Sequence, residues 1–174
     1  MKKALFLDRD GVINVEKEYL YKIEDFEFID GIFELCKHYQ ELGYEIFVVT
    51  NQSGIARGYY TEDDFHLLTS WMEKEFVKKD IYIKKVYYCP HHPSISGECM
   101  CRKPHPGMLL EAQKEFGIDL EHSILVGDKE RDIEAALHAG LLESYLFDEH
   151  HTTKSSKATK IVTKLKDIYH ADFK

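Results

Sequence analysis

The chain has 174 residues, of which 44% are hydrophobic and 31% are charged, and its formal net charge at pH 7 is −8. The acidic balance argues against broad binding to nucleic acid or to an anionic membrane, and no apolar run reaches the roughly 20 residues that a membrane-spanning helix needs. Lys2 and Lys3 precede too short an apolar run for a secretory signal. We therefore expect a cytoplasmic monomer with one domain over residues 1–174.

Strands and helices are predicted to alternate along the chain. The apolar run Ala4 to Leu7 is typical of a buried parallel strand, and similar runs predict further strands at residues 45–50, 83–88, 123–126, 144–147 and 160–162. Helical spacing of apolar residues predicts helices at residues 31–42, 61–79, 106–117 and 131–139, and one after residue 162. This alternation predicts an α/β fold, a three-layer doubly wound parallel sheet.

Polar side chains follow three of the predicted strands. Asp8 and Asp10 follow the first strand, Thr50 and Asn51 end the second, and Asp128 follows the fourth. Because the carboxyl ends of parallel strands meet at one edge of a sheet, we expect these side chains to converge. Carboxylates suit Mg²⁺, and a carboxylate can also act as a nucleophile. Taken alone, the first pair of aspartates is equally compatible with a solvated turn.

A long segment without periodicity follows the third strand. It holds a C-x-H pair, Cys89 and His91, and a C-x-C pair, Cys99 and Cys101. Three thiolates and one imidazole satisfy a tetrahedral Zn²⁺, and four protein ligands indicate a structural rather than a catalytic site. We expect zinc to hold together this loop, residues 89–101, because the loop has no core of its own. The alternative is ordinary thiols beside a surface histidine.

Short motifs in the chain resemble, in order and in position, those of the haloacid dehalogenase superfamily of phosphotransferases. The matching segments are Asp8-Arg9-Asp10-Gly11, Thr50-Asn51-Gln52, Lys103-Pro104, and Gly127-Asp128 with Asp132. The resemblance covers roughly residues 4 to 140. It implies an enzyme, a Mg²⁺-dependent hydrolase of phosphoric monoesters.

The resemblance also implies roles for individual residues. Asp8 would attack phosphorus and form an aspartyl-phosphate, and Asp10 would protonate the leaving oxygen and then activate water. Thr50 and Asn51 would hold the transferring phosphoryl group, while Lys103 would neutralise its charge.

The magnesium ligands implied by the same resemblance are Asp8, the Asp10 carbonyl and Asp128. Asp132 would orient Asp128 or the Lys103 ammonium.

The zinc loop and the residues after it indicate which family of this superfamily the chain resembles. Residues 89–93 and 99–108 resemble the D-glycero-D-manno-heptose 1,7-bisphosphate 7-phosphatases, and histidinol-phosphate phosphatases share the zinc pattern. Residues 26–31 and 51–58 favour the heptose family, and the chain length is similar to that of capless members, which lack a lid domain. The resemblance implies removal of the C7 phosphate, which gives heptose 1-phosphate for the ADP- or GDP-heptose used in lipopolysaccharide synthesis.

Short loops are expected to select the sugar bisphosphate substrate. The expected contacts are Glu16, Lys17, Glu18, Tyr19, Thr50, Asn51, Gln52, Ser53, Arg102, Lys103 and Lys129. Arg102 is the candidate for binding the second phosphate, at the anomeric position. Residues 16–19 depart from the compact, glycine-containing segment of the heptose family, which leaves the sugar and its anomer open.

Three alternatives remain at this point. The nearest is a histidinol-phosphate or other small-metabolite phosphatase with the same mechanism. A phospho-aspartate signalling receiver is disfavoured, because receivers carry the phosphorylated aspartate on a middle strand. A zinc-binding module without activity is disfavoured by the presence of Asp8, Asp10 and Lys103.

Two smaller features complete the sequence analysis. Arg57 can be a substrate contact or a surface residue, and Tyr59-Tyr60 is expected to be packing only.

Overall fold

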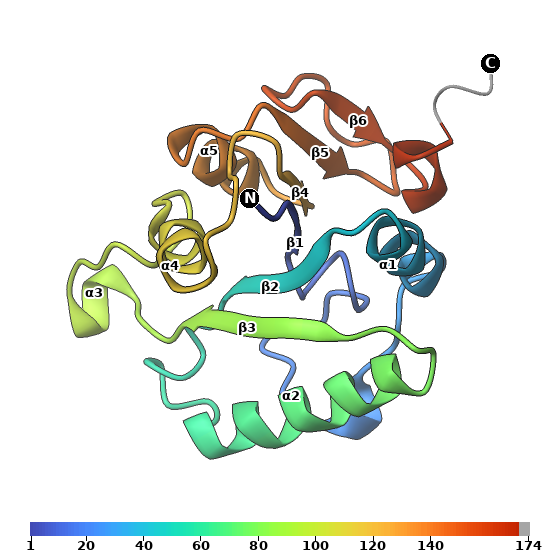
Figure 1. The fold of residues 1–174 in the computed structure, drawn as a ribbon. Helices are drawn as coiled ribbons and strands as arrows, with labels where there is room; N and C mark the ends of the chain where they lie inside the picture. The colour runs from blue at the N-terminus through green and yellow to red at the C-terminus, as the bar shows by residue number, and fades with distance from the viewer. Residues whose placement is uncertain (171–174) are drawn as a thin grey trace.

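The structure, a computed structural model, describes residues 1–170 and is built around one parallel sheet (Figure 1). Its strands are β1 (Ala4–Leu7), β2 (Glu45–Asn51), β3 (Ile83–Cys89), β4 (Ile124–Gly127), β5 (Glu143–Phe147) and β6 (Lys160–Val162). They lie in the order β3-β2-β1-β4-β5-β6, and every neighbouring pair is parallel. The predicted doubly wound α/β fold is confirmed.

Helices cover both faces of the sheet. They are α1 (Ile32–Glu41), α2 (Glu62–Val77), the short α3 (Pro93–Ser96), α4 (Gly107–Phe116) and α5 (Glu130–His138), with two 3-10 turns, η1 (Ile23–Asp25) and η2 (Leu165–Ile168). One apolar cluster joins α1 and α2 to the sheet, and a second joins α4 and α5 to the opposite face (Figure 1). The described residues form this three-layer core without a cap domain.

The central strand shows why its sequence is continuously apolar. Leu5 and Leu7 belong to the cluster beneath α1 and α2, whereas Ala4 and Phe6 belong to the cluster beneath α4 and α5. Successive side chains of a strand point to opposite faces, so a strand covered on both sides has no position left for a polar residue. The first polar side chain comes where β1 ends, at Asp8.

Local signals fix the ends of the helices. The Thr61 hydroxyl accepts a hydrogen bond from the Asp64 backbone N–H, and the Asp64 carboxylate accepts one from the Thr61 backbone N–H. This reciprocal cap begins α2. At the end of α4, Gly117 adopts φ 66°, a left-handed conformation that glycine reaches at little cost.

Two segments differ from the prediction. Helix α3 was not expected, because four residues are too few to show a helical period; Pro93 at its first position and the His92 ring, which accepts from the Ser94 backbone, define it instead. The expected terminal helix is only the turn η2, and residues 171–174 lie outside the described part of the chain. Within residues 1–170, no helix has both the length and the apolar character required to cross a bilayer.

The strand order places the carboxyl ends of β2, β1 and β4 side by side. The chain continues from β1 to β2 on one side and from β4 to β5 on the other, so the strand order reverses between β1 and β4. Doubly wound sheets bind ligands in the crevice at such a point. Asp8, Asn51 and Asp128 all lie at this edge.

Candidate active site

A buried lysine lies between two carboxylates at the end of β1. Lys103 Nζ is 3.0 Å from Asp8 Oδ1 and 2.6 Å from Asp132 Oδ1, and it also donates to the Val49 carbonyl at 2.9 Å. Burial lowers the pKa of Lys103, but Asp132 and Asp8 together raise it above its ordinary value. The lysine therefore stays charged at neutral pH and compensates the negative charge of the nucleophile candidate. Asp132 contacts this ammonium, one of the two roles expected for it.

The carboxylates of Asp8, Asp128 and Asp132 form a cluster whose oxygens lie within 4.8 Å of one another. Burial, followed by the charge of Asp132, raises the pKa of Asp8 well above its ordinary value, and Lys103 opposes this shift. Burial also raises the pKa of Asp128 to about 6. The negative charges of such a cluster repel one another, and a bound cation would reduce this repulsion.

One oxygen in this cluster points to where a cation would bind. Asp128 Oδ1 is buried, and no donor from residues 1–170 reaches it. A buried carboxylate oxygen without a partner is costly, and Mg²⁺ prefers carboxylate oxygens and retained waters. The donor set of Asp8 and Asp128 therefore fits a magnesium ion.

Gly11 leaves room for the Asp128 side chain. A Cβ atom at Gly11 would lie 2.0 Å from Asp128 Oδ2, and Gly11 has a φ of +93°. Both the close approach and the left-handed backbone exclude other residues there. The glycine of the Asp8-Arg9-Asp10-Gly11 motif thus provides the space that Asp128, the aspartate after β4, occupies.

The Asp10 carboxylate is held from both sides. Its Oδ1 accepts hydrogen bonds from Arg9 (Nη2, 3.0 Å) and Asn14 (Nδ2, 3.1 Å), and its Oδ2 accepts one from Gln52 (Nε2, 3.0 Å). Arg9 is only 1% exposed, and it also donates to the Leu20 carbonyl. This fixed orientation is what a group that exchanges protons with a substrate requires.

The two residues expected to hold the phosphoryl group have other side-chain partners here. Asn51 brackets the Lys103 backbone, with Oδ1 accepting from its N–H at 3.0 Å and Nδ2 donating to its carbonyl at 3.3 Å. The Thr50 hydroxyl accepts a hydrogen bond from Gln52 Nε2 at 2.9 Å, and Thr50 is 1% exposed. Asn51 therefore positions the catalytic lysine candidate, and Thr50 lies beneath the site.

A polar cleft of about 290 Å³ opens above these residues. All the expected substrate contacts except Thr50 line it: Glu16, Lys17, Glu18, Tyr19, Asn51, Gln52, Ser53, Arg102, Lys103 and Lys129. Asp8, Asp10 and Asp128 also line it, so the nucleophile, acid/base and metal-ligand candidates lie in the same cleft.

Positively charged side chains around the cleft form a candidate anion-binding site. Lys129 Nζ lies 3.3 Å from Glu16 and 3.6 Å from Asp128. Burial lowers the pKa of Lys129, but the two acids raise it above its ordinary value. Arg57 and Arg102 lie close enough to His92 to lower its pKa together with desolvation. A ligand with separated negative charges matches this arrangement.

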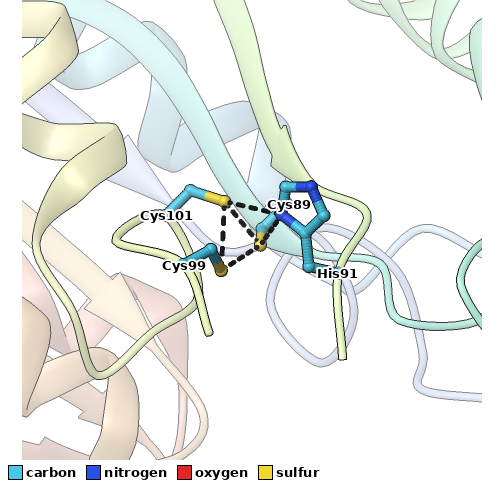
Figure 2. Close-up of side chains that lie close together, drawn as sticks. All are labelled: Cys89, His91, Cys99 and Cys101. Atoms are coloured by element: carbon cyan, nitrogen blue, oxygen red, sulfur yellow. Dashed lines mark hydrogen bonds between the residues drawn. The ribbon is translucent and has the colours of Figure 1, made fainter. Parts of the chain in front are cut away.

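The predicted zinc ligands converge beside the cleft (Figure 2). Figure 2 shows the side chains of Cys89, His91, Cys99 and Cys101 pointing toward a common centre. Their ligand atoms lie within 4.8 Å of one another, and Cys99 Sγ is 3.5 Å from Cys89 Sγ and 3.6 Å from Cys101 Sγ. None of the three cysteines forms a disulfide. This set of three sulfurs and one nitrogen fits a tetrahedral zinc ion.

Comparison with known proteins identifies the family. Residues 100–168 match the HAD-hydrolase-like family model. A D-glycero-alpha-D-manno-heptose-1,7-bisphosphate 7-phosphatase from Campylobacter jejuni is 56% identical over 84% of this chain and 83% of its own length. The chain belongs to the heptose-1,7-bisphosphate 7-phosphatase family of HAD-like hydrolases. It is thus a hydrolase of phosphoric monoesters.

Other members of the heptose bisphosphatase family agree with this assignment. The D-glycero-beta-D-manno-heptose-1,7-bisphosphate 7-phosphatase of Escherichia coli K12 is 49% identical over 79% of this chain and 75% of its own length. The crystal structure of D,D-heptose 1,7-bisphosphate phosphatase from B. bronchiseptica, complexed with magnesium and phosphate, has a TM-score of 0.85 at 26% identity. That alignment covers 97% of each chain.

Sequence reasoning missed several residues of the site in this member of the heptose bisphosphatase family. Arg131 and Tyr60 line the cleft, as does Arg57, for which the sequence allows either a substrate contact or a surface position. Arg131 lies two positions after Lys129 at the start of α5, a signal that could have been used. Nothing in the local pattern around Tyr60 distinguished it from a packing residue, because its role depends on a contact with Gln52.

The raised pKa of Asp128 gives the heptose bisphosphatase site a testable pH dependence. In Mg²⁺-free buffer, wild-type protein is expected to lose stability relative to Asp128→Asn as the pH rises from about 4 to about 6.5. The Asp128 pKa is raised from its ordinary value of 3.8 to about 6 in the folded state, so ionisation of this carboxyl between the two values favours the unfolded chain. Melting temperatures should show a relative loss of a few degrees. Mg²⁺ should restore the wild type at the higher pH. A wild-type melting temperature that rises relative to the variant over this range would contradict the assignment.

Proposed function

We propose that this protein removes the C7 phosphate of D-glycero-D-manno-heptose 1,7-bisphosphate and releases heptose 1-phosphate. The main support is the cleft, in which the Asp8 carboxylate, the Lys103 ammonium and the held Asp10 carboxyl lie together. Relatives that carry this substrate in their names include one that is 56% identical to the chain. We also propose that the whole chain is one monomeric phosphatase domain in the cytoplasm, and that the product serves ADP- or GDP-heptose synthesis.

The reaction would proceed in two steps. An Asp8 oxygen attacks the C7 phosphorus, and the bond from phosphorus to the sugar oxygen breaks while Asp10 gives that oxygen a proton. Water then attacks the phosphorus of the aspartyl-phosphate, Asp10 takes a proton from it, and inorganic phosphate leaves Asp8 free again. Lys103, charged and 3.0 Å from Asp8, would neutralise the charge carried by the transferring group.

Magnesium would be held by Asp8, the Asp10 carbonyl and Asp128. The unpaired Asp128 Oδ1 and the pKa values of Asp8 and Asp128, both raised chiefly by burial, support this assignment. When bound, the ion supplies positive charge opposite the phosphoryl oxygens. Asp132, hydrogen-bonded to the Lys129 backbone at 3.0 Å and paired with Lys103, would keep the lysine beside the nucleophile.

The remaining substrate contacts would come from the rim of the cleft. The Arg102 guanidinium is our candidate for the anomeric phosphate, since it lines the cleft beside the zinc loop and donates to the His91 carbonyl at 3.4 Å. Glu16 and Lys129, which line the cleft and form an ion pair, would contact the sugar or its phosphates.

Cys89, His91, Cys99 and Cys101 would hold a structural Zn²⁺. Burial raises the pKa of Cys89 and Cys101, so without a cation these thiols keep protons that a metal would displace. Elemental analysis of purified protein is expected to find about one zinc per chain, and Cys99→Ser is expected to lower that content. Cys36→Ser, which changes a buried cysteine of α1, is the control that should keep the zinc. Wild-type protein purified without zinc and with an unchanged melting temperature in chelator would contradict the site.

A substrate panel tests the proposed function. Both anomers of heptose 1,7-bisphosphate and histidinol phosphate are compared by kcat/KM with Mg²⁺ present. We expect one heptose anomer to be preferred over histidinol phosphate by at least about 100-fold. The second phosphate of the heptose substrate can form charge-assisted hydrogen bonds with the cleft, and histidinol phosphate has no second phosphate to form them. A preference for histidinol phosphate would replace the proposal with its nearest alternative, and the ratio between anomers decides which pathway the product enters.

A further inference from the structure

A chain of hydrogen bonds joins Tyr60 to the acid/base candidate. The Tyr60 hydroxyl donates to Gln52 Oε1, and Gln52 Nε2 donates to Asp10 Oδ2 at 3.0 Å and to the Thr50 hydroxyl at 2.9 Å. The oxygen and the nitrogen of an amide occupy opposite sides of the group, so a hydroxyl donor at the oxygen fixes the nitrogen toward Asp10. The tyrosine thereby holds the oxygen end of the Gln52 amide, while Asp10 and Thr50 accept hydrogen bonds from its nitrogen end.

The surroundings of Tyr60 are built for this contact. Its ring stacks on Tyr21 with centroids 5.5 Å apart, and the residue is 6% exposed. A Cβ atom on Gly54 would lie 2.2 Å from Tyr60 Cε1, so the ring occupies its place only because residue 54 is glycine. Burial raises the pKa of Tyr60 to about 12 despite the nearby Arg9 guanidinium, and the hydroxyl therefore remains a donor at neutral pH.

The two Asp10 oxygens are not equivalent. Oδ1 accepts hydrogen bonds from Arg9 and Asn14, whereas Oδ2 accepts one from Gln52 alone. Oδ2 is consequently the oxygen with space for a transferable proton. The Gln52 donor fixes the position of that oxygen.

We propose that Tyr60 is a positioning residue which, through Gln52, orients Asp10 Oδ2 for proton transfer to the leaving oxygen. The inference rests on the proposed function of Asp10. In the first step, the bond from Asp8 to phosphorus forms, the bond from phosphorus to the ester oxygen breaks, and the Oδ2 proton passes to that oxygen. Loss of the Tyr60 hydroxyl frees the Gln52 amide to turn, and Oδ2 loses its fixed direction.

The leaving group provides a test, because only a poor one needs the proton. Values of kcat/KM report the steps up to departure of the leaving group, and p-nitrophenolate departs without protonation whereas a sugar alkoxide does not. Tyr60→Phe is expected to lower kcat/KM for heptose 1,7-bisphosphate by roughly tenfold, as for the loss of one oriented hydrogen bond, and for p-nitrophenyl phosphate by less than about twofold. Asp10→Asn should show the same selectivity with a larger loss.

Controls separate this role from folding and from the proposed function. Tyr87→Phe removes the hydroxyl of an equally buried tyrosine, which donates to Glu115 outside the cleft, and should change neither ester. Gly54→Ala keeps the Tyr60 hydroxyl but displaces its ring, and should reproduce the selective loss. Equal losses on both esters, or none, would overturn the positioning role while leaving the phosphatase intact. A wild-type protein inactive on both esters would overturn the proposed function itself.

Discussion

Asp8→Asn is expected to lower kcat by roughly 10⁴-fold or more, because the variant lacks the carboxylate that attacks phosphorus. Binding should persist. An asparagine at this position keeps an oxygen for Lys103 and for the Arg9 backbone, which both donate to Asp8 Oδ1 in the wild type. Isothermal titration with the heptose bisphosphate should therefore give an affinity similar to that of the wild type, and quenched-flow assays should show no phosphate release.

Stability measurements distinguish lost chemistry from lost structure in this variant. Burial raises the pKa of Asp8 well above its ordinary value, so its charge costs folding free energy that a neutral amide avoids. We expect the melting temperature of Asp8→Asn to equal or exceed that of the wild type. Asp63→Asn, an exposed change in the first turn of α2, serves as the control with normal turnover. Near-normal kcat for Asp8→Asn would remove the nucleophile assignment.

Lys103→Met should impair both catalysis and stability. Its ammonium contacts Asp8 and Asp132, all three residues are buried, and deletion leaves two carboxylates without their cation. Breaking a buried ion pair by removing one partner typically costs about 3–5 kcal/mol. The loss of a preorganised cation at the phosphoryl group is expected to lower kcat by roughly 10³-fold. Urea titrations and steady-state assays measure the two effects.

An exposed lysine offers a matched control for this substitution. Lys85 pairs with Glu115 at 2.9 Å, but both side chains are about two-fifths exposed, at 39% and 40%. Pairs of this kind contribute about 0–1 kcal/mol, so Lys85→Met should change the free energy of unfolding little and kcat not at all. If Lys103→Met behaved like Lys85→Met, the ion-pair account of the site would be wrong.

The sheet and the metal-binding edge were predictable because their signals are local. Ala4 to Leu7 is apolar without interruption since both faces of β1 are covered, and the polarity changes abruptly at Asp8. The same change marks Asn51 at the end of β2 and Asp128 after β4. Parallel pairing then brings these positions together without further information from the sequence.

The hydrogen bonds that connect residues of the site to one another were not predictable, because they depend on tertiary distances. Gln52 meets Asp10 from 42 positions away, and Asn51 meets the Lys103 backbone from 52 positions away. A tyrosine beside a glycine-containing loop has the same local pattern whether it packs or donates to an amide. Only the fold shows that Tyr60 contacts Gln52 and that Gly54 leaves space for it.

The central claim is that Asp8 carries the phosphoryl group, and a trapping experiment tests it most directly. Protein mixed with heptose 1,7-bisphosphate labelled at the C7 phosphorus is quenched in acid within one turnover, digested, and analysed for labelled peptides. The account predicts a transient label on the peptide that contains Asp8, absent from Asp8→Asn. Turnover with no label on that peptide, or with label on another residue, would contradict it.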